Sequence, residues 1–144
     1  PRHRVEVDGV EARAAAQHGA FGSSAPMEQY VGRFRRFMQS GVYSPEWDMV
    51  TAGEDGKIGA FCLTWPDPLN RVGLFEPVGT HPDFHRKGLG KAVMLEALRR
   101  LRENGMRGAI VSTEEDNEPA IRLYEAAGFR IVNRLMTYQK KFAN

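Results

Sequence analysis

The first third of the chain has apolar residues at the spacing of an α-helix. An alanine-rich stretch over residues 10–21 has high helix propensity and predicts a first helix. A break over residues 22–26 supplies good helix-capping residues, and a second helix is predicted over 27–39. The apolar positions of this second helix form a stripe that we interpret as core: Tyr30, Phe34, Phe37 and Met38.

The middle of the chain changes to the pattern of β-strands. Strands are predicted over residues 47–52, 57–64 and 71–79. The pair Asp55-Gly56 between the first two is typical of a tight hairpin turn. Val5 and Val7 alternate with charged residues and predict a further short strand at the start of the chain.

The last third alternates helices and strands. A helix begins near Leu89 and ends at Asn104-Gly105, and residues 106–113 are apolar and β-branched, which predicts a buried parallel strand. Another helix follows Asn117 and stops at Gly128, and residues 129–142 are predicted to form a final strand or bent strand pair. This order predicts an α/β fold of the mixed α+β kind, with a mixed sheet and helices on its faces.

Composition narrows the class of protein. The 144 residues suit a single domain, 1–144, although a start at Pro1 leaves open a chain cut from a longer protein. Twenty basic residues against 18 acidic ones give a net charge of +2, too small to indicate a nucleic-acid partner. No apolar run is long enough to span a membrane. The single cysteine, Cys62, is interpreted as core and fits a reducing, cytoplasmic compartment, and we expect a monomer or a homodimer.

The stretch Thr80–Ala92 carries the strongest chemical signal. A predicted strand turns through Gly88 and Gly90 into the N-terminus of a helix, which presents free backbone N–H groups and the positive end of the helix dipole. Nearby positive charges come from Arg86, Lys87 and Lys91. The stretch predicts an anion site, although glycines that only permit a tight turn would explain this loop if it stood alone.

Three well-known kinds of binding motif do not match the residues of this stretch. A Walker phosphate loop needs Ser or Thr after Gly-Lys, but Ala92 follows Lys91. A dinucleotide fingerprint needs a third glycine, and Val93 stands there. His81 and His85 have the spacing of a zinc pair without its helix and central glutamate, so we expect no metal.

A second motif lies about 30 residues further on, and its positions are Asn117, Ala120, Tyr124, Gly128 and Phe129. Together with Gly88-x-Gly90, this pattern resembles the GNAT superfamily of acyl-CoA N-acyltransferases, over about residues 71–130. The first position of the family's loop is usually Gln or Arg, and here it is His85. This departure puts in doubt any contact of that side chain with the cofactor.

The resemblance implies a GNAT fold, in which a mostly antiparallel mixed sheet contains a parallel strand pair that splays apart to hold acyl-CoA. Acetyl-CoA is then the implied co-substrate, beside an amine acceptor. The implied cofactor-binding residues are Val78, Gly79, Thr80, His85, Arg86, Lys87, Gly88, Leu89, Gly90, Lys91, Asn117 and Tyr124.

The resemblance also implies catalytic roles. The reaction is direct attack of a neutral amine on the thioester, with the N–H of Val78 as oxyanion donor and Tyr124 as the acid that protonates the leaving sulfur. Glu76 is the candidate general base, because Phe75 and Pro77 beside it would desolvate its carboxylate. Two of these roles have alternatives: Glu76 could anchor the amine or be an ordinary strand residue, and Tyr124 could be a core tyrosine. His81 is a weaker candidate for the general base.

Specificity is expected from the first two helices and the connection over residues 65–70. The candidate lining residues are Tyr30, Tyr43, Trp47, Trp65 and Asp67. The leading hypothesis is an N-acetyltransferase that acts on a small-molecule amine. The alternatives are a protein or peptide acetyltransferase and a non-catalytic acyl-CoA-binding domain.

Overall fold

The computed structural model describes residues 9–143, so the short strand predicted at Val5 and Val7 lies outside the described residues. The predicted helices and the first three strands are confirmed, with ends that shift by one to three residues. The elements are α1 (Val10–Ala20), α2 (Met27–Met38), the short 3₁₀ helix η2 (Pro45–Trp47), β1 (Asp48–Ala52), β2 (Ile58–Asp67), β3 (Val72–Thr80), the 3₁₀ helix η3 (Pro82–Phe84), α3 (Leu89–Glu103), β4 (Gly108–Val111) and α4 (Glu118–Ala126).

The described strands form one sheet in the order β1-β2-β3-β4. The pairs β1–β2 and β2–β3 are antiparallel, and β3 and β4 are parallel. This topology confirms the mixed, mostly antiparallel sheet. The parallel pair results from the crossover through α3, since two parallel strands need a long connection between them.

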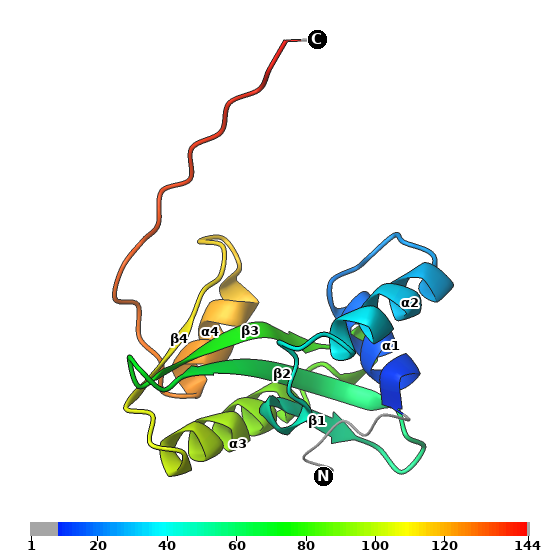
Figure 1. Ribbon diagram of the computed structural model, residues 1–144, viewed down its shortest axis with the longest axis horizontal. Helices are drawn as coiled ribbons and strands as arrows, with labels where there is room; N and C mark the ends of the chain where they lie inside the picture. Colours follow the sequence, from blue (N-terminus) through cyan, green and yellow to red (C-terminus); the bar gives the residue numbers. More distant parts are fainter. Residues whose placement is uncertain (1–8, 144) are drawn as a thin grey trace.

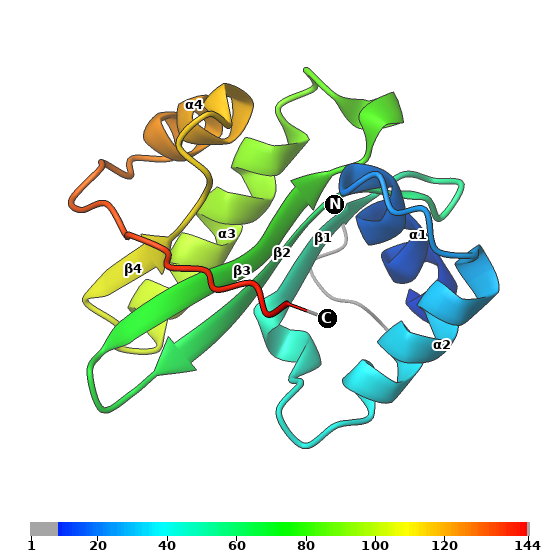
Figure 2. The ribbon, with the colours of Figure 1, turned by 90° about the horizontal axis from the view of Figure 1, so that it is seen from above.

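Helices cover both faces of the sheet, as predicted (Figures 1 and 2). On one face, α3 packs its apolar stripe against the strands, and Met94, Ala97 and Leu101 are almost fully buried there. On the other face, Ala16 of α1 packs against Phe61 of β2. The two cores lie back to back, because alternate residues of each strand point to opposite faces.

A buried ion pair joins α1 to the sheet. The Arg13 Nε donates to both carboxylate oxygens of Asp48, at 3.1 and 3.0 Å, and both side chains are 0% exposed. The Arg13 guanidinium also lies over the Phe61 ring, 4.0 Å from its centroid. The Tyr43 hydroxyl donates to Asp48 at 3.0 Å, and burial together with this carboxylate raises the pKa of Tyr43. One network therefore fixes α1, β1 and the loop after α2.

One prediction for the last third is correct only in part, and another is wrong. The strand predicted over 106–113 forms as β4 and is parallel to β3, but it is shorter than predicted and not fully buried, since Ile110 is 53% exposed. Residues 129–143 contain neither helix nor strand, and they run away from the sheet as an extended segment (Figure 1). High β-propensity does not produce a strand without a neighbouring strand to pair with.

The buried pair generates a stability prediction. Asp48→Asn keeps the shape of the side chain but leaves the Arg13 charge buried without its counter-ion. We expect the free energy of unfolding to fall by about 3–5 kcal/mol, the usual effect of breaking a buried pair. Equilibrium urea unfolding of wild type and variant measures the difference.

The matched control is Glu118→Gln, which removes the same charge from an exposed pair with Arg122 on α4. Exposed pairs contribute about 0–1 kcal/mol, so this variant should unfold close to wild type. Equal losses from the two variants would contradict the role assigned to the Arg13–Asp48 pair.

Candidate active site

The parting of β3 from β4 creates the site. Val72–Phe75 of β3 pair with Gly108–Val111 of β4, and the ladder then stops, while β3 continues to Thr80 beside β2. At this point β3 contains a bulge: Cys62 faces Val78 and Thr64 faces Phe75, so β3 uses one residue more than β2.

Two backbone features explain why the parallel ladder stops there. Pro77 has no N–H to donate. The carbonyl of Glu76 accepts a hydrogen bond from the Trp65 indole Nε1 at 2.7 Å, so a side chain of β2 provides it with a partner. Beyond Phe75, the side of β3 that faces away from β2 is therefore open along Glu76–Thr80. The end of the ladder agrees with the splayed strand pair that the family resemblance implies.

The glycine loop follows directly after β3. Gly88 caps the N-terminus of α3 with φ = 72°, a left-handed conformation that glycine adopts without steric cost. Arg86 is also left-handed, with φ = 61°. No side chain of the N-cap residue bonds the first turn of α3, so the first backbone N–H groups of this helix remain available to a ligand. The loop therefore has the geometry of an anion site.

Side chains around the loop hold it in place. The His85 ring bonds the carbonyl of Thr80 through Nε2 at 3.1 Å, which closes the loop onto the end of β3. A Cβ on Gly90 would lie 3.0 Å from Thr80 Oγ1 and 3.3 Å from Leu123 of α4, so glycine lets α3 and α4 approach closely. The Lys87 ammonium lies 5.1 Å from the centroid of the Phe84 ring. His85 thus contacts its own loop.

Tyr124 and Val78 lie on the same side of the sheet. Both are partly buried and pack against the core beneath α3. The Tyr124 ring lies 6.4 Å from the ring of Phe129, and Phe129 packs against Phe75 at 5.5 Å between ring centroids. Burial raises the pKa of Tyr124, so its phenol stays protonated at neutral pH. The structure therefore places a protonated phenol on the face of the sheet that α3 covers.

The other predicted site residues have different surroundings. Glu76 is exposed within the bulge, so the desolvation that we expected from Phe75 and Pro77 does not occur. His81 packs against Gly19 of α1 and accepts a hydrogen bond from the N–H of Asp83 at 3.2 Å. Asn117 caps α4, where its Oδ1 accepts from the N–H of Ala120 at 3.3 Å. Hydrogen bonds thus hold His81 and Asn117 in structural positions.

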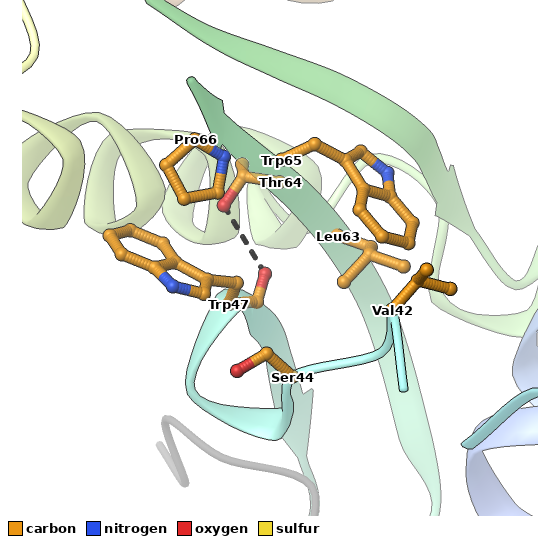
Figure 3. Close-up of a pocket in the computed structure, with 7 residues that line it drawn as sticks. All are labelled: Val42, Ser44, Trp47, Leu63, Thr64, Trp65 and Pro66. Atoms are coloured by element: carbon orange, nitrogen blue, oxygen red, sulfur yellow. Dashed lines mark hydrogen bonds between the residues drawn. The ribbon is translucent and has the colours of Figure 1, made fainter. Parts of the chain in front are cut away.

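A pocket of about 240 Å³ opens beside the far end of β2 (Figure 3). Two predicted lining residues, Trp47 and Trp65, are part of its wall. The residues that sequence reasoning missed are Val42, Ser44, Leu63, Thr64 and Pro66. They come from the loop after α2 and from β2, which the fold brings together, so no local pattern marks them. The Trp65 indole joins this pocket to the bulge through its bond to Glu76.

The remaining lining candidates do not face this pocket. Tyr43 is bound to Asp48, and Tyr30 packs edge-on against His18 with ring centroids 5.1 Å apart. Asp67 accepts hydrogen bonds from Asn70 in the β2–β3 turn, and these bonds lower the pKa of Asp67.

Within residues 9–143, the structure has no group of three His, Cys, Asp or Glu side chains that could hold a metal ion. No described helix combines the length and apolar character needed to cross a membrane.

Cys62 is completely buried, and burial raises the pKa of its thiol well above the usual value. This confirms the interpretation of Cys62 as a core residue.

Two curated relatives of the chain have the same description. A mycothiol acetyltransferase of Saccharomonospora viridis is 31% identical over 147 residues, which covers 95% of this chain and 48% of that protein. The corresponding protein of Nocardiopsis dassonvillei is 33% identical over 97 residues, or 60% of this chain and 28% of that protein. The chain thus spans at most about half the length of these relatives.

Solved structures share the fold at low sequence identity. The aminoglycoside acetyltransferase AAC(6')-Iy, in complex with a bisubstrate analogue of coenzyme A, superposes with a TM-score of 0.74 at 16% identity and covers 96% of this chain and 95% of that chain. The ribosomal-protein-S18-alanine N-acetyltransferase of Escherichia coli gives a TM-score of 0.68 at 21% identity, over 90% and 77% of the two chains. One fold therefore serves small-molecule and protein acceptors.

The family model of the acetyltransferase (GNAT) family matches residues 17–129, which include the strand bulge, the glycine loop and the helix that carries Tyr124. This match extends over most of the chain and agrees with the motifs and with the parting of β3 from β4. The chain belongs to the GNAT family of acetyltransferases.

Proposed function

We propose that this protein is an N-acetyltransferase that moves the acetyl group of acetyl-CoA to a primary amine of a small molecule. One observation carries the proposal: β3 parts from β4 beside the glycine loop, with the Tyr124 phenol on the same side of the sheet. A gap between strands can hold an extended thioester arm, and the loop can hold its anionic end.

The binding of acetyl-CoA follows from the backbone of this region. The free N–H groups at the start of α3 are suited to the pyrophosphate, and the positive charges of Arg86, Lys87 and Lys91 add attraction. The unpaired side of β3 over Val78–Thr80 can hydrogen-bond the amide groups of the pantetheine arm. His85 is bound to Thr80, so we assign it to loop closure rather than to a cofactor contact.

The proposed reaction is a direct transfer. The neutral amine nitrogen attacks the thioester carbon, the new C–N bond forms, and the C–S bond breaks. The N–H of Val78 stabilises the negative charge on the carbonyl oxygen. Tyr124 donates its proton to the leaving sulfur, and the attacking nitrogen loses a proton to a base or to water. Because burial keeps Tyr124 protonated, the acid is ready before the amine attacks.

Glu76 remains the candidate base, but as an exposed carboxylate rather than a desolvated one. Its exposed carboxylate on the bulge is accessible to water and to an incoming ammonium group. We therefore propose that Glu76 attracts and orients the charged amine and accepts its proton through water. His81 is a poorer candidate, since its ring is packed against Gly19 and bonded to Asp83.

The acceptor is proposed from the relatives and the pocket. Mycothiol and aminoglycoside acetyltransferases are named for small polar molecules. The pocket beside Trp65 has a volume of about 240 Å³, which suits part of such a molecule. A peptide amine is the second candidate, because the exposed Glu76 also leaves room for a chain terminus.

The single buried cysteine fits a reducing, cytoplasmic location.

Tyr124→Phe tests the acid role. The variant keeps the ring packing against Phe129 but has no proton to give, and general acid catalysis typically contributes 10²–10⁴-fold. We expect kcat to fall by about 100-fold with little change in KM for acetyl-CoA. The assay follows thiol release with acetyl-CoA and a panel of aminoglycosides, mycothiol-type amines and peptides.

The control for this variant is Tyr138→Phe, the same substitution on a phenol that is 90% exposed in the C-terminal segment. Its kcat should match wild type. If Tyr124→Phe retains full kcat, the acid assignment is wrong. Binding of coenzyme A without turnover on any acceptor would instead favour a non-catalytic acyl-CoA-binding domain.

Gly88→Ala tests the anion site. The residue is left-handed with open space around it, so a Cβ would strain the backbone and occupy the approach to the N–H groups. We expect the Kd for coenzyme A, measured by calorimetry, to rise about 10-fold, equivalent to about 1.4 kcal/mol.

Gly105→Ala is the matched control at the opposite end of α3. Gly105 is also left-handed, with φ = 85° and open space around it. Both variants should lose about 1–2 kcal/mol of stability through backbone strain, but only Gly88→Ala should weaken coenzyme A binding. Equal weakening by both would show that strain, not the loop, controls affinity.

A further inference from the structure

Glu76 and Pro77 form the part of β3 that the backbone of β2 does not hold. The neighbouring residues Phe75 and Val78 pair with β2, but the described register assigns no β2 partner to the two residues between them. Pro77 has no N–H, so it cannot donate to any strand. The orientation of this bulge must therefore depend on a contact outside the backbone ladder.

The Trp65 side chain supplies that contact. Trp65 is opposite Leu74 in the antiparallel register, so Glu76 is its diagonal neighbour, two residues further along β3. An aromatic side chain can reach this diagonal position, and the indole Nε1 donates to the Glu76 carbonyl at 2.7 Å. The Trp65 ring also packs against Phe37 of α2, with ring centroids 6.2 Å apart. The donor to the bulge is thus part of a ring that α2 helps to hold in place.

The N–H of Val78 points away from β2, toward the open side of β3. The N–H of His81 donates to the Gly59 carbonyl at 2.8 Å, which makes these two residues a hydrogen-bonded pair. Hydrogen-bonded and non-hydrogen-bonded pairs alternate along an antiparallel ladder. Three residues back in the register, Val78 and Cys62 therefore form a non-hydrogen-bonded pair. The Val78 N–H is consequently available to a ligand in the gap beside β4.

One soft torsion separates the Glu76 carbonyl from the Val78 N–H. The peptide units on both sides of Pro77 are planar, and the pyrrolidine ring holds φ of Pro77 at about −65°. This leaves ψ of Pro77 as the torsion that can turn freely between the two groups. A hydrogen bond that fixes the direction of the Glu76 carbonyl therefore also restricts the direction of the Val78 N–H.

We propose that Trp65 is a positioning residue for the acetyl transfer, because its indole N–H holds the bulge in the orientation that aims the Val78 N–H at the oxyanion. An oxyanion donor is effective only when it is aimed at the place where charge develops. The Trp65 ring also forms part of the wall of the pocket beside β2 (Figure 3). One side chain thus connects the proposed amine site to the group that polarises the thioester. This role of Trp65 rests on the proposed function.

The replacement of a single group in the indole ring tests this role. The chain has two tryptophans, so Trp47→Phe leaves Trp65 as the remaining one. This variant is produced either with ordinary tryptophan or with the analogue in which sulfur replaces the indole N–H. The two samples have nearly the same ring and the same pocket wall, and they differ in the donor to Glu76. Any effect of Trp47→Phe itself is common to both samples.

We expect the sulfur analogue to lower kcat about 10-fold, the equivalent of one ordinary hydrogen bond lost in the transition state. The KM values for acetyl-CoA and for the amine should not change, because the ring that forms the pocket wall is retained. Thiol release with the acceptor panel used for Tyr124→Phe measures both constants. Trp65→Phe in the otherwise unchanged chain should show the same loss of kcat, and urea unfolding checks that it is folded.

Nuclear magnetic resonance of isotope-labelled protein gives a readout without turnover. We expect the amide peak of Val78 to move when the sulfur analogue replaces tryptophan, because the N–H changes its direction. The amide of Gly105, at the opposite end of α3, is the internal control and should not move.

The outcomes separate this role from the proposed function. Turnover with an unchanged kcat in the sulfur-substituted protein, a change in the KM for the amine alone, or an unmoved Val78 amide peak would overturn the role of Trp65 and leave the acetyltransferase assignment intact. No turnover by the wild type on any acceptor of the panel would overturn the proposed function, and with it the part of Trp65 in the reaction.

Discussion

The bulge in β3 is the constraint on which the site depends. One extra residue between Phe75 and Val78 lets both side chains pack on the same face, which plain alternation would not allow. Pro77 cannot donate a hydrogen bond, and the Glu76 carbonyl accepts from Trp65 instead of from β4. The parallel ladder ends at Phe75, and the backbone beyond that residue is the proposed track for the thioester arm.

The Arg13–Asp48 pair supports this site from the other face. The Arg13 guanidinium stacks on the Phe61 ring. A Cβ on Gly79 would lie only 2.5 Å from that ring, which is too close for any residue with a side chain. Gly79 thus lets β3 lie close over the aromatic ring. The buried charge pair, the ring and the open part of β3 form one packed stack. Loss of the pair should consequently disturb the site as well as overall stability.

Much of the fold could be predicted, because the spacing of apolar residues that indicates a helix or a strand is contained in a short stretch of sequence. Two helices, a three-strand meander and the helix pair around Gly88 and Asn117 follow from spacing and capping residues alone. The glycine loop could be recognised from its residue types and their spacing, and Tyr124 was singled out through the family resemblance. The exposure of Glu76 could not be predicted, since it depends on a bulge and on which parts of the sheet the helices cover. The pocket beside Trp65 joins residues from separate segments, and no sequence window contains it.

The wrong prediction for residues 129–142 has a physical cause. The segment has the β-branched and aromatic residues of a strand, but β-structure is stabilised by cross-strand neighbours rather than by the chain itself. In the single chain that neighbour is missing for the segment, and β4 lacks a neighbour on its outer edge. Sequence propensity alone therefore overestimates the strand content of residues 129–142.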